Sequence, residues 1–203
     1  MSAIPQIAVL VDPSRSYGRD IVRGIRRYVA EHGPWSLYLE SRDLSSSFPD
    51  WLEKWPGDGI LARTVDEQLL RKLKATKLPV IELRSTMLQH PFPFVGMDNS
   101  LVGSRVAGHF RDRGFQRFAC CIDTSEKFYM QRCEHFIETL REQGFDCAVF
   151  QTATPGKKRP RWDEHQRALA DWLRSLEKPV GVFACNDQLG FWVLDAARRA
   201  GIS

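Results

Sequence analysis

The sequence contains no apolar run that approaches the ~20 consecutive apolar residues of a membrane-spanning helix. Its N-terminus also lacks the basic head and apolar core of a secretory signal. We therefore expect a cytoplasmic protein that has no membrane partner.

Cysteine is scarce, with five residues and no C-x-x-C pair among them. An odd number without paired spacing favours neither a disulfide framework nor a zinc site, so the thiols are predicted to be reduced core residues. The five histidines are scattered, without His-x-x-x-His spacing or a neighbouring carboxylate pattern. The sequence therefore predicts no metal site.

Common catalytic and cofactor motifs are missing as well. The sequence has neither G-x-G-x-x-G nor G-x-x-x-x-G-K-[ST], the glycine-rich loops that approach phosphates closely. It has no G-x-S-x-G elbow, and no cysteine stands in a context for nucleophilic chemistry. We expect a binding protein without a cofactor, and not an enzyme.

Charge is nearly balanced, with 29 basic and 25 acidic residues and a net charge of +4. The one basic run, residues 157–161, lies among Pro and Gly and is interpreted as a solvated loop, in preference to a nucleic-acid contact. A content of 43% hydrophobic residues is typical of a folded globular protein, and the length allows one domain or two small lobes.

The chain does show a regular alternation of two patterns. Short apolar runs alternate with segments whose apolar residues recur at helical spacing. The predicted strands are residues 7–11, 35–40, 59–62, 79–83, 94–97, 117–122, 148–151 and 180–185. The predicted helices are residues 21–29, 48–55, 66–75, 98–113, 127–143, 163–176 and 187–200. This alternation predicts an α/β fold with doubly wound parallel sheets, arranged as two lobes of residues 1–122 and 123–203.

Ligands of such sheets bind beyond the carboxyl ends of the strands, which defines where candidate site residues lie. Those at strand ends, or on the helix that opens the second lobe, are Tyr17, Arg19, Arg84, Asp98, Arg132, Asn186 and Asp187. Helix capping is the simpler role for the three Asp and Asn residues, and surface exposure for the others. Arg, Asp and Asn can each pair with adjacent hydroxyls while an aromatic ring covers a sugar face, so this set suits an aldose.

Several segments together resemble the effector domain of the lactose/galactose repressor superfamily, and within it the xylose operon regulators. They are SYGR at 16–19 before Gly24 and Ile25, DGILA at 58–62, LPVI at 78–81, VGMDN at 95–99 and FACNDQ at 183–188. The similarity runs in order through essentially all 203 residues. Each motif is weak alone, and the combination is specific.

The resemblance implies two lobes of the periplasmic-binding-protein type I kind, with xylose or a related aldose bound between them. It implies that Asp98, Arg132, Asn186 and Asp187 contact the sugar, whereas Tyr17, Arg19 and Arg84 lie in loops that vary in the family. It further implies a homodimer whose operator DNA is bound by an AraC-type domain absent from this chain. Because the family continues with another strand after the last helix, the second lobe is expected to be incomplete.

Two other functions remain open from the residues alone. A small α/β enzyme acting on a sugar or nucleotide can be built on a similar sheet, because fold does not determine function. A transport receptor would share the architecture but would need an export signal.

Overall fold

The computed structural model describes residues 4–14, 16–39, 50–64, 66–83, 91–152 and 161–202. The chain divides into two compact units, Met1–Met97 and Asp98–Ser203. Each unit is an α/β structure in which all paired strands run parallel. The predicted fold class is therefore confirmed.

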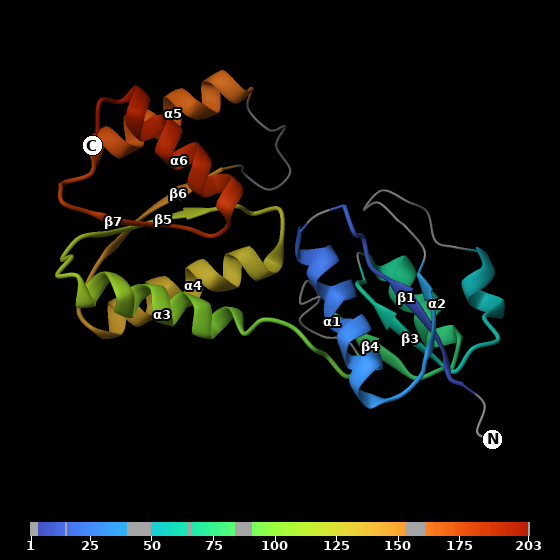
Figure 1. Cartoon of the computed structure of the whole chain (residues 1–203). Helices are drawn as coiled ribbons and strands as arrows, with labels where there is room; N and C mark the ends of the chain where they lie inside the picture. Colours follow the sequence, from blue (N-terminus) through green and yellow to red (C-terminus); the bar gives the residue numbers. More distant parts are fainter. Residues whose placement is uncertain are drawn as a thin grey trace. The chain divides into compact units, whose positions relative to one another are not determined.

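The first unit is built on a four-stranded sheet with the order β2-β1-β3-β4. Its elements are β1 (Gln6–Leu10), α1 (Ser16–His32), β2 (Ser36–Leu39), the 3₁₀ helix η1 (Asp50–Lys54), β3 (Gly59–Ala62), α2 (Glu67–Ala75) and β4 (Val80–Glu82). Helix α1 covers one face of the sheet, and α2 with η1 covers the other (Figure 1).

The core of the first unit lies between the sheet and α2. Its buried members are Ala8, Leu10, Leu52, Ile60, Ala62, Leu69, Leu73 and Val80. Helix α2 begins where the Asp66 side chain accepts a hydrogen bond from the backbone N–H of Leu69 at 2.8 Å, and its leucines pack against the sheet. Complete burial of a leucine such as Leu73 contributes about 2 kcal/mol to folding.

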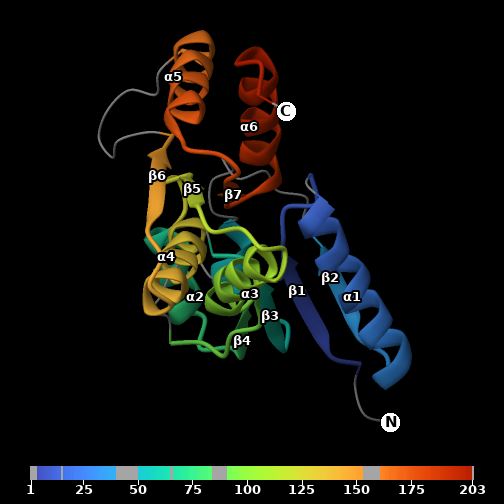
Figure 2. The ribbon, with the colours of Figure 1, turned by 90° about the vertical axis from the view of Figure 1, so that its left-hand side faces the viewer.

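The second unit is built on a three-stranded sheet with the order β6-β5-β7. Its elements are α3 (Asn99–Asp112), β5 (Phe118–Ile122), α4 (Lys127–Glu142), β6 (Cys147–Gln151), α5 (Trp162–Ser175), β7 (Gly181–Ala184) and α6 (Asp187–Arg199). Helices α3 and α4 lie on one face of this sheet, and α5 and α6 lie on the other face, as Figures 1 and 2 both show.

The central strand β5 is buried along its whole length, which explains why its sequence FACCI is uninterrupted by polar residues. Phe136 of α4 is fully buried against the sheet, with its ring 5.0 Å from that of Phe183 on β7 and 6.0 Å from that of Phe110 on α3. Helix α3 approaches α4 closely at Gly103, where a Cβ atom would lie only 2.3 Å from the carbonyl oxygen of Arg132. Glycine is therefore required for this helix pair to pack.

Two expectations about the chain's organisation are corrected. The sequence predicts a boundary after residue 122, but the units divide between Met97 and Asp98, because α3 packs on α4 and β5 is the central strand of the second sheet. A strand is predicted at residues 94–97, but this segment forms only a single bridge, between Phe94 and Glu82 at the end of β4. Proline at 93 and glycine at 96 limit any longer pairing.

The cysteines are core residues of the second unit, as the sequence predicts. All five are free thiols, and four are buried within the core of the second unit. Among the residues that the structure describes, no helix combines the length and apolar character needed to cross a bilayer.

Candidate functional site

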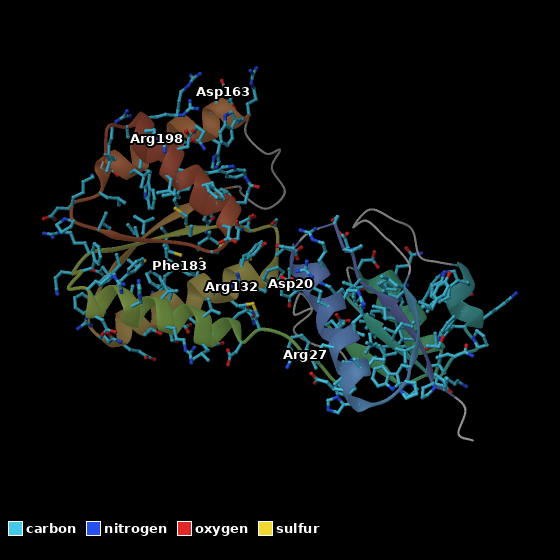
Figure 3. The ribbon with its side chains drawn as sticks, viewed as in Figure 1. Asp20, Arg27, Arg132, Asp163, Phe183 and Arg198 are labelled. Carbon is cyan, nitrogen blue, oxygen red and sulfur yellow. The ribbon has the colours of Figure 1, made fainter. Side chains whose placement is uncertain are left out.

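The candidate site is the edge of the second unit where β5 and β7 end side by side. Cys121 of β5 pairs with Ala184 of β7, so the residues that follow the two strands emerge together. Asp123 follows β5, and Asn186 follows β7 at the start of α6. Helix α4 also begins at this edge, which places Arg132 in its second turn close to both strand ends (Figure 3).

Arg132 is fixed by two hydrogen bonds to groups far away in the sequence. Its Nε donates to Oδ1 of Asn99 at 2.9 Å, and its Nη1 donates to the carbonyl oxygen of Cys185 at 3.0 Å. The guanidinium also lies over the rings of Phe128 and Tyr129, at 5.5 and 5.6 Å from their centroids. Charge-assisted bonds and ring contacts together hold this cation in one orientation.

Asn186 joins the start of α6 to the end of β5. Its Oδ1 accepts a hydrogen bond from the backbone N–H of Leu189 at 2.8 Å, which caps the helix. Its Nδ2 donates to Oδ2 of Asp123 at 3.4 Å, and the other carboxylate oxygen of Asp123 accepts from the backbone N–H of Ser125 at 2.9 Å. The capping bond therefore fixes which end of the amide faces Asp123.

The phenol of Tyr129 and the thiol of Cys185 both have raised pKa values, which keeps them neutral near pH 7. Burial raises the pKa of Tyr129, and the nearby Asp123 carboxylate raises it further. A hydrogen bond with the Cys133 thiol, together with burial, raises the pKa of Cys185. The edge thus presents a carboxylate, an amide, a guanidinium and a neutral phenol beside aromatic rings, groups that are chemically able to hydrogen-bond a hydroxylated compound. Within the described residues, no three His, Cys, Asp or Glu side chains gather to hold a metal ion.

The other predicted residues of the second unit have simpler surroundings. Asp98 caps α3, with Oδ1 accepting from the backbone N–H of Leu101 at 2.9 Å. It immediately precedes Asn99, the partner of Arg132. Asp187 is exposed in the first turn of α6. The structure thus confirms capping for Asp98 and Asn186, and their contact with a ligand stays a prediction.

Two of the predicted residues of the first unit, Tyr17 and Arg19, lie in the first turn of α1. Arg19 donates from Nη1 to the carbonyl oxygens of Pro13 and Ser14, at 3.2 and 2.7 Å, so it clamps the loop that follows β1. Tyr17 is 43% exposed, and the guanidinium of Arg63 lies 5.0 Å from its ring centroid. Arg84 lies outside the described residues.

Sequence reasoning missed a buried polar pair at the ends of β3 and β4. The backbone N–H of Thr64 donates to Oε1 of Glu82 at 3.0 Å, and the hydroxyl of Thr64 donates to Oε2 of the same carboxylate. Both residues are almost fully buried. A buried carboxylate needs such partners, so this pair fixes the two strand ends relative to one another.

The sequence prediction of the second unit's edge also omitted Asn99, Asp123 and Tyr129. Asp123 could have been predicted, because it directly follows a predicted strand and ligands bind beyond the carboxyl ends of such strands. Asn99 also stands at the end of a predicted strand, one residue after Asp98, so the same rule covered its segment. Tyr129 carries no such signal, since its role depends on how α4 places it beside Arg132.

Comparison with known protein families agrees with this architecture. Residues 107–203 match the family model described as a periplasmic binding protein-like domain, and residues 6–100 match the model described as the XylR N-terminal domain. The fold is therefore that of the periplasmic-binding-protein-like α/β proteins.

One relative and two solved structures show the similarity in more detail. The xylose operon regulatory protein of Haemophilus influenzae is 24% identical over 206 residues, which cover 98% of this chain and 52% of that protein. The structure of the xylose-binding transcription activator XylR aligns with a TM-score of 0.82 and 22% identity, covering 99% of this chain and 52% of the other. A periplasmic binding protein/LacI transcriptional regulator from Alkaliphilus metalliredigens, solved with D-xylulofuranose, aligns with a TM-score of 0.68 and 15% identity, covering 98% and 74%.

The chain is thus similar to the xylose operon regulatory proteins over almost its whole length. It spans about half the length of the curated relatives that it matches.

Proposed function

We propose that this chain is the sugar-sensing part of a cytoplasmic transcription regulator, and that its effector is xylose or a related aldose. It acts by binding, without catalysis. In the regulator it controls operator binding by an AraC-type domain beyond this chain, and the regulator acts as a homodimer. The xylose operon regulators among its relatives support this assignment.

The single observation that carries the proposal is the polar edge of the second unit. Arg132 is held by Asn99 and by the carbonyl of Cys185, directly beside the Asn186–Asp123 pair. A sugar presents several adjacent hydroxyls, each of which both donates and accepts a hydrogen bond. The edge offers the donors of Arg132 and Asn186 and the acceptor of Asp123, and the rings of Phe128 and Tyr129 lie beside the Arg132 guanidinium. These groups complement the hydroxyls and the apolar face of a sugar.

The same contacts provide a route from ligand to signal. Arg132 donates hydrogen bonds to the first residue of α3 and to the backbone just before α6. A ligand that hydrogen-bonds to the Arg132 guanidinium therefore affects both helices. A ligand shifts a conformational equilibrium only as far as its affinities for the two states differ. A tenfold preference corresponds to about 1.4 kcal/mol. That one sugar also contacts the strand ends of the first unit stays a prediction.

Isothermal titration calorimetry of the chain with D-xylose, L-arabinose, D-ribose and D-glucose tests the proposal. We expect heat from a pentose, and weaker or no heat from glucose. Arg132→Gln should reduce the affinity at least tenfold, because it removes the cation, while Arg141→Gln on the outer side of the same helix should leave binding unchanged. Binding of none of these sugars by a folded chain would count against a sugar sensor.

A further inference from the structure

Asp123 is held in place by its neighbours although it lies at the end of a strand. Its backbone N–H donates to the sulfur of Cys185 at 3.3 Å, and its Oδ1 accepts from the backbone N–H of Ser125 at 2.9 Å. These contacts fix both the backbone and the carboxylate. A side chain fixed before binding loses little conformational entropy when a ligand arrives.

The second carboxylate oxygen faces the amide of Asn186 across a gap that is long for a hydrogen bond. Nδ2 of Asn186 lies 3.4 Å from Oδ2 of Asp123, beyond the usual 2.7–3.2 Å range for such a bond. The amide cannot turn to improve it without breaking the capping bond from Leu189. The pair therefore leaves an acceptor and a donor whose direct bond is weak.

A single hydroxyl satisfies both groups at once. Its O–H donates to the carboxylate while its oxygen accepts from the amide, which replaces one long bond by two of normal length. An ether or a deoxy position at that point loses one or both bonds.

The carboxylate of Asp123 places a negative charge at this point. Within the described part of the chain Asp123 takes part in no ion pair, and its charge contributes to the raised pKa of Tyr129. The nearby cation, Arg132, directs its Nε to Asn99 and its Nη1 to the carbonyl of Cys185. An anionic group of a ligand placed between Asp123 and Asn186 meets like charge.

We propose that Asp123 is a specificity-determining residue, which binds one free hydroxyl of a neutral sugar jointly with Asn186 and rejects ligands that carry an anionic group at that position. This inference rests on the proposed sugar-sensing function. It assigns a role to a residue that the comparison with known families leaves unassigned, and it restricts the effector to neutral, unphosphorylated sugars.

The test compares each neutral sugar with its aldonate, the open-chain anion formed by oxidation at C1, by calorimetry on the whole chain: D-xylose with D-xylonate and L-arabinose with L-arabinonate. The wild-type chain should bind a neutral sugar at least tenfold more tightly than its aldonate. Asp123→Asn keeps the shape of the side chain and removes its charge. It should lower the affinity for the neutral sugar about tenfold and reduce the ratio of the affinities for the neutral sugar and the aldonate. The matched control is Asp146→Asn, an exposed residue just before β6 at the opposite edge of the same sheet, which should change neither.

A second variant keeps the inference falsifiable if Asp123→Asn folds poorly, as judged by circular dichroism. Asp123→Glu retains the charge but displaces the carboxylate, so it should lose affinity for the neutral sugar and still reject the aldonate. If no sugar binds the wild-type chain, the proposed function itself fails. If the wild-type chain binds a sugar and a folded Asp123 variant has the same affinity and the same preference, the role of Asp123 is overturned and the sugar sensor stands.

Discussion

The Nε of Arg132 donates a hydrogen bond to Oδ1 of Asn99, and this bond joins the second turn of α4 to the first residue of α3. Asn99 is only 6% exposed, so the bond is shielded from competing water. It is also the contact through which a cation of the candidate site is supported from a neighbouring helix. Changes at Asn99 should therefore affect both stability and ligand binding.

Replacing Asn99 by Ala removes the acceptor and leaves part of the Arg132 guanidinium without its partner. The free energy of unfolding should fall by about 1–3 kcal/mol, the usual cost of an unsatisfied buried polar group. Urea unfolding followed by circular dichroism measures the loss, and calorimetry should show weaker sugar binding. Asn99→Asp keeps an acceptor for Arg132 and should retain more of the affinity; equal loss in both variants would argue against this role of the bond.

Gly103 controls how closely α3 and α4 pack. A Cβ atom there would lie 2.3 Å from the carbonyl oxygen of Arg132 and 2.7 Å from the backbone nitrogen of Phe136, so Gly103→Ala must push the helices apart. We expect a loss of about 1–3 kcal/mol, as for overpacked cores. The matched control is Gly108→Ala on the same helix, where nothing lies within 4 Å and alanine should stabilise by about 0.5–1 kcal/mol. Opposite signs in two urea titrations would support the close approach, and stabilisation by both would refute it.

His165 should make the second unit less stable in acid. The side chain is 7% exposed, with its ring against those of Phe150 and Trp192, and burial lowers its pKa in the folded state. The unfolded chain then binds the proton more readily, so this residue has no effect well above its ordinary pKa of about 6.5 and lowers stability as the pH falls below it. His165→Phe removes the titration, and the difference in unfolding free energy between pH 7.5 and pH 5.0 should shrink. An unchanged difference would contradict the assignment.

The thiols of the second unit should be unreactive while the chain is folded. Burial raises the pKa of Cys121, and it raises that of Cys147 to about 12, which leaves very little thiolate near neutral pH. Ellman's reagent at pH 8 should therefore label the native chain much more slowly than free cysteine, and should label all five thiols in urea. Cys147 is the one that is not fully buried, so Cys147→Ser shows how much of any native labelling comes from this position.

The local elements were predictable because they depend on short stretches of sequence. The apolar run of β5 and the helical spacing of α4 each predict their element to within about a residue. The capping roles of Asp98 and Asn186 were predicted as one reading of those residues and are confirmed by bonds that span only three residues. The predicted strand at 94–97 failed because Pro93 and Gly96 limit its pairing with β4 to a single bridge.

The candidate site was predictable only in part. Arg132 was identified, but its partners Asn99 and Cys185 are 33 and 53 residues away along the chain, and nothing in the local sequence pairs them. Their approach depends on the close contact of α3 with α4 at Gly103, which is a property of the packed unit. The unit boundary was misplaced for the same reason, since the attachment of α3 to α4 is invisible in the order of elements.

The two units occupy consecutive stretches of the polypeptide, so one junction near Met97 separates them in sequence. Asn99, Asp123, Arg132 and Asn186 all fall on the same side of that junction. Segmental isotope labelling from residue 98 onward would therefore give nuclear magnetic resonance spectra of this half alone, and sugar-induced chemical-shift changes could be traced to it without altering any side chain.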